Sequence, residues 1–187
     1  MGYHTFDADR AANLEDPTRF RYCSREELLA GLGIAGASAV TVADLGSGTG
    51  FYTDEIAPYV EHLYAVDVQG AMHDYYREKG VPEAVEPVTA EVADLPLDDD
   101  TLDGAYSTMT YHEFASDAAL AELRRVLAPG APLVTVDWSA RGEGASGPPT
   151  DERYDRDRAV EHHEDAGFVV DRAVSRPETF VLVATAE

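Results

Sequence analysis

The sequence contains 187 residues, 44% of them hydrophobic, and its 36 Asp and Glu against 14 Lys and Arg give a formal net charge of −22 at pH 7. Because binding to a polyanion requires clustered cations, this charge argues against DNA or RNA as a partner. The length predicts one domain spanning residues 1–187 that can enclose a small-molecule site, and no window approaches the roughly 18 uncharged apolar residues of a membrane span.

The start of the chain, MGYHTFDADR, lacks the basic and then apolar layout of a secretory signal, which predicts a cytoplasmic protein. Acidic residues alternate with periodic apolar runs, so they are expected on the surface of a folded domain. Such a surface is either an ordinary solvated face or an adaptation to high salt, where ions screen its self-repulsion. The lone Cys23 predicts neither a disulfide nor a metal site. The composition leaves a monomer and a homodimer open.

The first 37 residues are predicted to form a lid or a strap ahead of a core of residues 38–187. Ser24 and Glu27 form a capping box that opens a short helix toward Gly31. Aromatic and charged residues precede this helix, and they either close over a site that must exclude water or simply hold the N-terminus against the core. They are Tyr3, His4, Phe6 and residues 19–22.

Five short apolar runs alternate with helical patterns in the middle of the chain. The runs are residues 40–45, 63–68, 85–89, 102–108 and 132–138. Between the last two, the helical pattern of residues 116–127 places Leu120, Leu123 and Leu127 on one face. Strand and helix in succession predict right-handed crossovers and a parallel sheet covered on both faces.

Two further strand-like runs, residues 168–174 and 179–185, close the chain. Only four residues separate them, and so short a link joins only an antiparallel pair. The expected fold class is therefore α/β, a Rossmann-like doubly wound, mostly parallel seven-stranded sheet with a C-terminal antiparallel hairpin. The Gly-, Ser- and Pro-rich residues 140–149 predict a loop after the fifth strand rather than a domain boundary.

Directly behind the first predicted strand, the stretch VADLGSGTGFY places Gly46, Gly48 and Gly50 at alternate positions. Ligands of open parallel sheets bind beyond the strand ends where the winding reverses. Glycines there allow positive φ and close approach of a ligand, and the following helix would offer N–H groups to an anion. Phe51 occupies the place of the third glycine of a dinucleotide fingerprint, which indicates a smaller anionic end than a pyrophosphate.

Two acids are predicted to border the same crevice. Asp67 ends the second strand and is positioned to accept both hydroxyls of a ribose. Asp94, in the run ADLPL, follows the third strand. The alternative for Asp94 is an ordinary solvated acid in a loop.

Together these features resemble the class I S-adenosylmethionine-dependent methyltransferases, and most closely the small enzymes of the ubiquinone and menaquinone biosynthesis type. The resemblance covers residues 38–138 in order and implies S-adenosylmethionine as cofactor. It rests on Asp44-x-Gly-x-Gly-x-Gly, Asp67, ADLP at 93–96, LDGAY at 102–106 and LRRVLAPG at 123–130. Those enzymes carry added acceptor-binding segments between late strands, whereas this chain has only residues 140–150, so a small-molecule acceptor is expected rather than a large quinone precursor.

The resemblance also implies a role for each cofactor-binding residue. The residues implied at the methionine end are Asp44, Gly46, Ser47, Gly48, Gly50 and Ser107. Around the sugar and base, Asp67 would hold the ribose and Val68 would pack against adenine. Asp94 would meet the adenine amino group, and the Leu95 N–H would meet a ring nitrogen.

Methyl transfer from a sulfonium is an in-line displacement, for which the protein supplies alignment and a dry site. An oxygen, nitrogen or carbon acceptor must also lose a proton. The candidate base is His112, whose ordinary pKa lies near neutrality, with Glu113 orienting it or acting itself and Tyr111 lining the pocket. The alternative is that His112 and Glu113 only cap the next helix.

Two other functions remain open: a non-catalytic module that binds the same cofactor, and an NAD-dependent oxidoreductase. Phe51 and the lack of a Tyr-x-x-x-Lys pair argue against the oxidoreductase. A metal site at His162 and His163 is not expected, because adjacent residues on a helix point about 100° apart. Arg141 and Arg153 either neutralise an anionic acceptor or form surface salt bridges.

Overall fold

The computed structural model describes residues 8–187. Helices separate most of the strands there, but none lies between the predicted runs at residues 85–89 and 102–108, where a helical pattern is expected from the sequence. The strands are β1 (Thr41–Leu45), β2 (His62–Asp67), β3 (Val85–Thr89), β4 (Gly104–Thr108), β5 (Pro132–Trp138), β6 (Phe168–Ser175) and β7 (Thr179–Ala186). The α-helices are α1 (Arg25–Gly31), α2 (Phe51–Ile56), α3 (Gly70–Lys79), α4 (Tyr111–Phe114), α5 (Asp117–Val126) and α6 (Arg156–Asp165). Short 3-10 helices are η1 (Ala8–Glu15), η2 (Pro17–Arg21), η3 (Ala57–Tyr59) and η4 (Thr150–Glu152). Tyr3, His4 and Phe6 lie outside the described residues.

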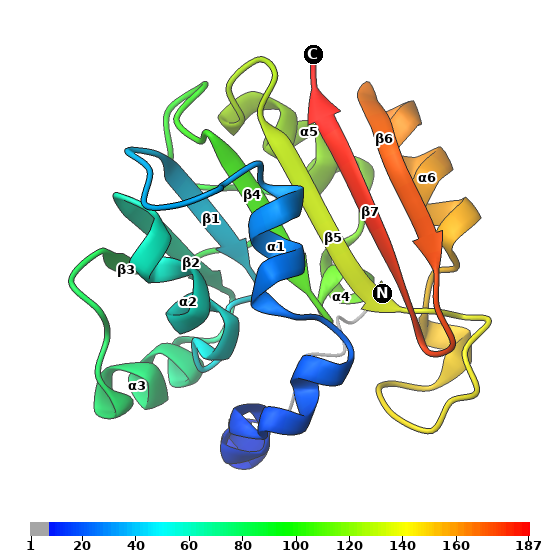
Figure 1. Ribbon diagram of the computed structural model, residues 1–187. Coiled ribbons are helices and arrows are strands. Elements are labelled where there is room, and N and C mark those ends of the chain that lie inside the picture. The colour runs from blue at the N-terminus through cyan, green and yellow to red at the C-terminus, as the bar shows by residue number, and fades with distance from the viewer. Residues whose placement is uncertain (1–7) are drawn as a thin grey trace.

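The strands form one sheet in the order β3-β2-β1-β4-β5-β7-β6 (Figure 1). The first five strands run parallel to one another, whereas β7 runs antiparallel to both β5 and β6. The winding reverses between β1 and β4, which is where open sheets of this kind bind ligands. This topology confirms the predicted Rossmann-like, mostly parallel sheet with an antiparallel C-terminal hairpin.

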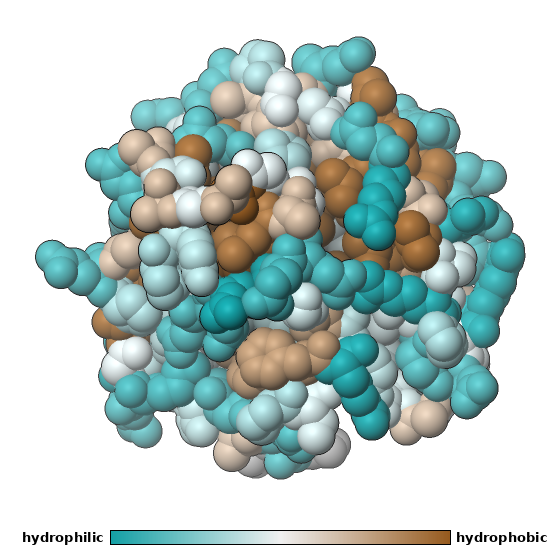
Figure 2. Space-filling view, viewed as in Figure 1, coloured by the Kyte–Doolittle hydropathy of each residue, from teal (hydrophilic) through white to brown (hydrophobic). Residues whose placement is uncertain are grey.

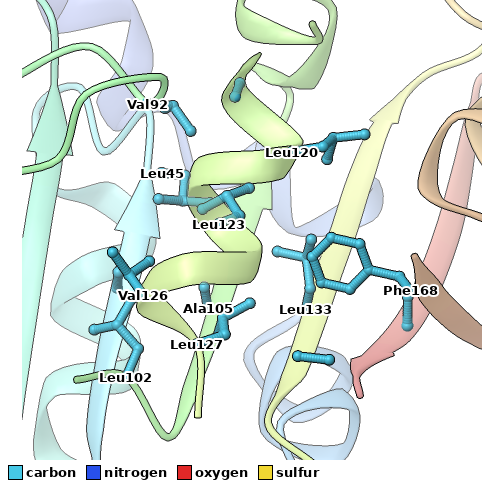
Figure 3. Close-up of a cluster of buried hydrophobic side chains, with 14 of the residues drawn as sticks. Leu45, Val92, Leu102, Ala105, Leu120, Leu123, Val126, Leu127, Leu133 and Phe168 are labelled. Carbon is cyan, nitrogen blue, oxygen red and sulfur yellow. The ribbon is translucent and has the colours of Figure 1, made fainter. Parts of the chain in front are cut away.

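Helices cover both faces of the sheet, with α1, α2 and α3 toward the viewer in Figure 1 and α5 and α6 behind. The buried side chains of Leu120, Leu123 and Val126 hold α5 in the core (Figure 3). Fully burying one such side chain stabilises the fold by about 1.5–3 kcal/mol. Ser116 caps this helix, since its Oγ accepts a hydrogen bond from the Ala119 N–H at 3.1 Å.

The fourth strand is shorter than the sequence predicts. β4 begins at Gly104 rather than at residue 102, because Leu102 forms only an isolated bridge with Leu127 just beyond α5. Both leucines are buried in the cluster of Figure 3. The apolar signal at position 102 therefore reflects core packing rather than strand pairing.

The predicted capping box opens α1. Ser24 Oγ accepts a hydrogen bond from the Glu27 N–H at 3.3 Å, and Glu27 Oε2 accepts one from the Ser24 N–H at 3.3 Å. Two donors at the start of the helix, which have no partner within it, are satisfied in this way. The helix is anchored by Leu28, which is fully buried.

Residues 8–21, here called the strap, are tied to the core around the only lysine of the chain. Lys79 Nζ lies 3.1 Å from Glu15 Oε2 on η1 and 2.9 Å from Asp54 Oδ2 on α2. Glu15 also accepts a hydrogen bond from the Thr49 hydroxyl, and Asp54 accepts one from the Tyr76 hydroxyl. These contacts place the strap beside the glycine-rich turn. A closing motion of this segment stays a prediction.

Hydrophilic residues cover most of the rim of the face shown in Figure 2, and apolar patches lie nearer its centre. The large hydrophobic side chains exposed among the described residues are Phe20, Val68 and Val169. No helix within residues 8–187 is long and apolar enough to cross a bilayer. Of the exposed side chains, Val68 belongs to the cavity described next.

Candidate functional site

A cavity of about 660 Å³ opens at the carboxyl ends of the parallel strands. Its walls come from the turn after β1, the end of β2, the segment after β3, residues 108–114 after β4, and the loop after β5. Leu14 and Arg19 of the strap complete the wall. Small-molecule sites in open α/β sheets have this size and this position, so the cavity is the candidate site.

The glycine-rich turn has a backbone that other residues adopt only with strain. Gly46, Gly48 and Gly50 have φ of 78°, 55° and 81°. A Cβ on Gly46 would lie 2.3 Å from Thr110 Cγ2, and one on Gly50 would lie 2.3 Å from Tyr76 Cζ. Gly46 and Gly48 line the cavity, whereas Gly50 lies outside it as the N-cap of α2. Two of the three glycines are therefore required by the packing of the protein itself.

The backbone amides of this turn already have partners inside the protein. The N–H groups of Gly46 and Ser47 donate to one carbonyl of β2, at 2.8 and 2.9 Å. The Gly48 N–H donates to Asp67 Oδ2 at 2.8 Å, and the Gly50 N–H donates to Ser47 O at 2.9 Å. These four amides are therefore not available to an anionic group of a ligand. The turn instead offers close approach and the Ser47 hydroxyl, which is more than nine-tenths buried and has no hydrogen-bond partner within residues 8–187.

Gly50→Ala is expected to lower the free energy of unfolding by about 2–4 kcal/mol, because it adds overpacking against Tyr76 to the cost of a left-handed backbone. Gly33→Ala is the matched control. Gly33 also has a positive φ, of 71°, but a Cβ there meets nothing within 4 Å, so a loss of only about 1–2 kcal/mol is expected. Urea denaturation measures both variants, and equal losses would show that the contact with Tyr76 is unimportant.

Two acids at the ends of neighbouring strands have different surroundings. Asp67, at the end of β2, lines the cavity, and its Oδ1 and Oδ2 accept hydrogen bonds from the N–H groups of Gln69 and Gly48, both at 2.8 Å. Asp44, at the penultimate position of β1, is fully buried outside the cavity, and its Oδ2 accepts a hydrogen bond from the Thr53 hydroxyl at 2.6 Å. Burial raises the pKa of Asp44 to about 7. Asp67 can therefore contact a ligand. Asp44 cannot, and its carboxylate instead links the end of β1 to α2 through Thr53.

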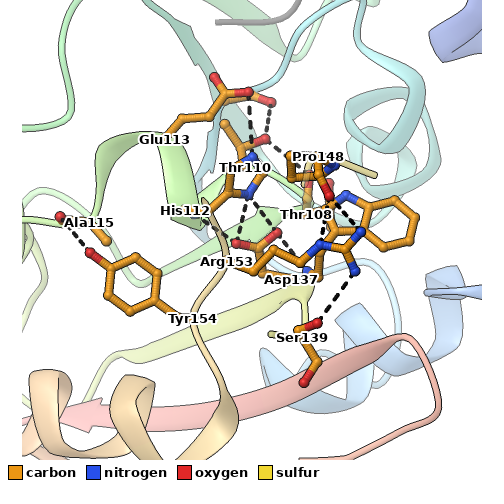
Figure 4. Close-up of polar contacts among 12 residues, drawn as sticks. Thr108, Thr110, His112, Glu113, Ala115, Asp137, Ser139, Pro148, Arg153 and Tyr154 are labelled. Carbon is orange, nitrogen blue, oxygen red and sulfur yellow. Dashed lines mark hydrogen bonds and ion pairs between the residues drawn. The ribbon is translucent and has the colours of Figure 1, made fainter. Parts of the chain in front are cut away.

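His112 lines the cavity and forms a close pair with Asp137, which lies behind it outside the lining (Figure 4). Asp137, in β5, is fully buried, and its two carboxylate oxygens lie 3.0 Å from His112 Nδ1. One of them also accepts the His112 backbone N–H at 2.7 Å. His112 Nε2 lies 3.8 Å from Glu113 Oε1, and both side chains line the cavity. The structure therefore brings two of the three predicted catalytic residues into the same cavity as Asp67.

This pairing sets the protonation of the imidazole. An ionised carboxylate only accepts hydrogen bonds, so Nδ1 carries the proton and Nε2 is left to accept one. Burial lowers the pKa of His112, but the hydrogen bond and charge of Asp137 outweigh it and the pKa is raised overall. Burial raises the pKa of Glu113 to about 7. The cavity thus holds two neighbouring groups suited to proton transfer near neutral pH.

Comparison with known proteins shows the family to which this chain belongs. A family model described as a methyltransferase domain matches residues 43–135. The crystal structure of a SAM dependent methyltransferase from Aquifex aeolicus, SAM being S-adenosylmethionine, is 33% identical and superposes with a TM-score of 0.88, covering 98% of this chain and 100% of that one. The chain belongs to the SAM-dependent methyltransferases. The resemblance inferred from the motifs is confirmed, and the oxidoreductase alternative is set aside.

Curated relatives are also methyltransferases, but they are longer than this chain. An uncharacterized methyltransferase-like protein of Schizosaccharomyces pombe is 34% identical over 103 residues, which are 54% of this chain and 39% of that protein. A demethylmenaquinone methyltransferase of Clavibacter sepedonicus is 31% identical over 108 residues, 57% of this chain and 44% of that protein. The methyltransferase described here thus spans about two fifths of the length of these relatives.

The cavity of the methyltransferase fits S-adenosylmethionine, which has an amino-acid end, a ribose and an apolar base. The Ser47 hydroxyl, which has no hydrogen-bond partner among residues 8–187, and the guanidinium of Arg19 offer polar groups near the turn. Asp67 lies in the middle of the lining, and Val68, 48% exposed, presents an apolar surface beyond it. Because a buried polar atom without a partner is costly, Ser47 is a group that a polar ligand would satisfy.

The acid after β3 that lines the cavity is Glu91 rather than Asp94. β3 ends at Thr89, so the next few residues lie at the strand end, and the chain then turns, with the Asp94 N–H donating to Glu91 O at 3.0 Å. Asp94 is exposed outside the lining, and the Leu95 N–H donates to Glu122 Oε1 at 2.8 Å. The predicted contacts of Asp94 and Leu95 with adenine are therefore not supported.

Two further predicted residues lie outside the cavity lining. Ser107 is fully buried in β4, and the next residues, Thr108, Met109 and Thr110, line the cavity instead. Tyr111 is buried in the core, and its hydroxyl lies 2.8 Å from His162 Nδ1. Neither side chain is placed to contact a ligand directly.

The loop after β5 lines the cavity with Gly147, Pro148 and Pro149, and Arg153 fixes its conformation. Its guanidinium donates to the carbonyls of Pro148, Ser146 and Ser139 and lies over the Trp138 ring, 5.6 Å from the centroid (Figure 4). Arg141 is paired with acids at the start of α6. Both arginines lie outside the lining. Of the two alternatives left open for them, surface salt bridges hold for Arg141, whereas Arg153 is buried. Within residues 8–187 no three metal-binding side chains cluster.

Proposed function

We propose that the methyltransferase transfers a methyl group in line to a small-molecule acceptor and that His112 takes the acceptor proton. The observation that carries this proposal is the His112–Asp137 pair, which borders the same cavity as the glycine-rich turn and Asp67. Asp137 acts as a positioning residue, because it fixes the tautomer and orientation of the imidazole. Trp138 and the loop behind it help to exclude water.

Cofactor binding is assigned to residues that line the cavity. Asp67 would accept hydrogen bonds from the ribose hydroxyls, Val68 would pack against the base, and Glu91 would accept from its amino group. Arg19 is the only Lys or Arg among the described lining residues, so it would pair with the carboxylate of the methionine end. S-adenosylmethionine supplies, when bound, a methyl group on a positively charged sulfur.

The residues around the transferred group then provide alignment and proton removal. His112 Nε2 would accept a proton from the acceptor, and the charge of Asp137 would stabilise the imidazolium that results. Glu113 lies beside the imidazole and can hold the acceptor. The chain thus supplies a base, an orienting acid and a shielded cavity.

Two measurements test this function. Calorimetric titration with S-adenosylhomocysteine should give saturable binding to the purified protein. Incubation of the protein with a metabolite extract and a deuterated methyl donor should then shift the mass of a small molecule. Binding without any labelled product from any fraction would contradict the proposed transfer, and absence of binding would contradict the cofactor site itself.

A further inference from the structure

We propose that the acceptor is a small cationic amine whose ammonium group binds the Glu113 carboxylate beside His112. This inference rests on the methyltransferase function proposed above and names its substrate class. It is drawn from the acceptor end of the cavity, defined here as the lining residues His112, Glu113, Phe114, Trp138, Pro148, Pro149 and Glu152.

Charge at the acceptor end is negative. Glu113 contributes a carboxylate, and none of the described lining residues there is a lysine or arginine. The neighbouring arginine, Arg153, is occupied by loop carbonyls and lies 3.8 Å from the Glu178 carboxylate. A phosphate or carboxylate would meet like charge in a low-dielectric site, whereas a cation would be attracted.

Among the described residues, none donates a hydrogen bond to the Glu113 carboxylate. In the part of the chain that the structure describes, its only charged neighbour within 4.0 Å is His112 Nε2, at 3.8 Å, and no group donates a hydrogen bond to it. Its side chain is 20% exposed, and that exposure faces the cavity. Half-buried carboxylates are costly when no donor satisfies them. An ammonium carries three N–H donors and a positive charge, so it meets both needs at once.

The rest of the acceptor end suits an apolar body. Phe114, Trp138, Pro148 and Pro149 supply aromatic and aliphatic surface on the walls around Glu113. Such walls bind an uncharged hydrocarbon or aromatic portion. The fitting molecule therefore has one ammonium group attached to a small apolar frame.

The chemistry balances with the residues in place. The ammonium first gives one proton to His112 Nε2, which leaves a neutral amine. The nitrogen lone pair then forms a bond to the methyl carbon while the carbon–sulfur bond breaks, and the electron pair of that bond stays on sulfur. The product is a methylated ammonium, and His112 releases its proton to water.

Calorimetry on the protein loaded with S-adenosylhomocysteine tests this assignment about one pH unit above the pKa of Glu113, which is about 7, so that Glu113 is ionised while the amine probe stays protonated. The probes are 2-phenylethylamine, 2-phenylethanol and phenylacetate, which share a ring and differ in charge. We expect the amine to bind at least tenfold more tightly than the alcohol, and phenylacetate to bind least. Glu113→Gln should abolish the preference for the amine. Glu164→Gln, an exposed change on α6, should leave it intact.

If the alcohol or the acid binds as tightly as the amine, or if none of the three binds, the assignment of an amine acceptor is wrong. The same holds if Glu113→Gln keeps the preference. Binding of S-adenosylhomocysteine, measured first in each sample, reports separately on the proposed function. Its failure would overturn both proposals, whereas its success beside a negative probe result would overturn the amine alone.

Discussion

His112→Gln is expected to lower kcat by 10²–10⁴-fold while the affinity for S-adenosylhomocysteine stays within twofold of the wild type. Glutamine keeps a polar side chain on α4 but cannot take a proton near neutral pH. Initial rates with the acceptor found in the labelled extract, together with calorimetry, measure the two quantities. His62→Gln is the matched control, because His62 starts β2 beside Glu86, outside the cavity lining.

The pH profile separates a base from a merely structural histidine. Since Asp137 raises the pKa of His112, the acidic limb of kcat in the wild type should lie above the ordinary histidine pKa. Asp137→Asn removes the charge but keeps an acceptor for Nδ1–H, so the limb should move to lower pH. A wild-type kcat in His112→Gln, or a limb that does not move in Asp137→Asn, would refute the role of the pair.

Asp67→Asn should weaken binding of S-adenosylhomocysteine by about 100-fold or more. Hydrogen bonds to a charged acceptor contribute about 1.5–3 kcal/mol each, and loss of about 3 kcal/mol corresponds to about 100-fold. The new amide NH₂ would also face one of the two backbone donors, Gly48 N–H or Gln69 N–H, that the carboxylate now satisfies. Calorimetric titration gives the dissociation constant.

Asp94→Asn provides the matched control for that change. Asp94 is exposed and lies outside the lining, so its substitution should leave the dissociation constant within twofold of the wild type. A large loss at Asp94 together with a small one at Asp67 would reverse the assignment of the two acids.

Much of the fold could be predicted from residue patterns because each element carries its own signal. Parallel strands buried on both faces appear as continuous apolar runs, and α5 shows its stripe of leucines between a serine cap and a Pro-Gly end. The short link before β7 allowed only an antiparallel pair. The predicted start of β4 at residue 102 was wrong, because Leu102 packs in the core and forms only an isolated bridge.

The site was less predictable than the fold, because it depends on contacts between residues that are far apart in the sequence. Asp67, the glycine-rich turn and His112 could be placed together because the carboxyl ends of parallel strands meet at one edge. β4 is buried throughout, so no alternation distinguished Ser107 from Thr108. The hydrogen bond from His112 to Asp137 joins residues 25 positions apart, and no local pattern records it. Glu91 was missed because the turn that separates it from Asp94 has no strong residue signature.

Lys79 makes the strap accessible to chemical labelling. A reagent that acylates amines finds a single lysine side chain in the whole chain, and that side chain is held between Glu15 and Asp54. Acylation removes the positive charge, so the Glu15 and Asp54 carboxylates lose their counter-ion and the strap loses its ion pair with α3. The rate at which this one residue is acylated, with and without S-adenosylhomocysteine, therefore measures how often the strap detaches from the cavity wall to which Leu14 and Arg19 belong.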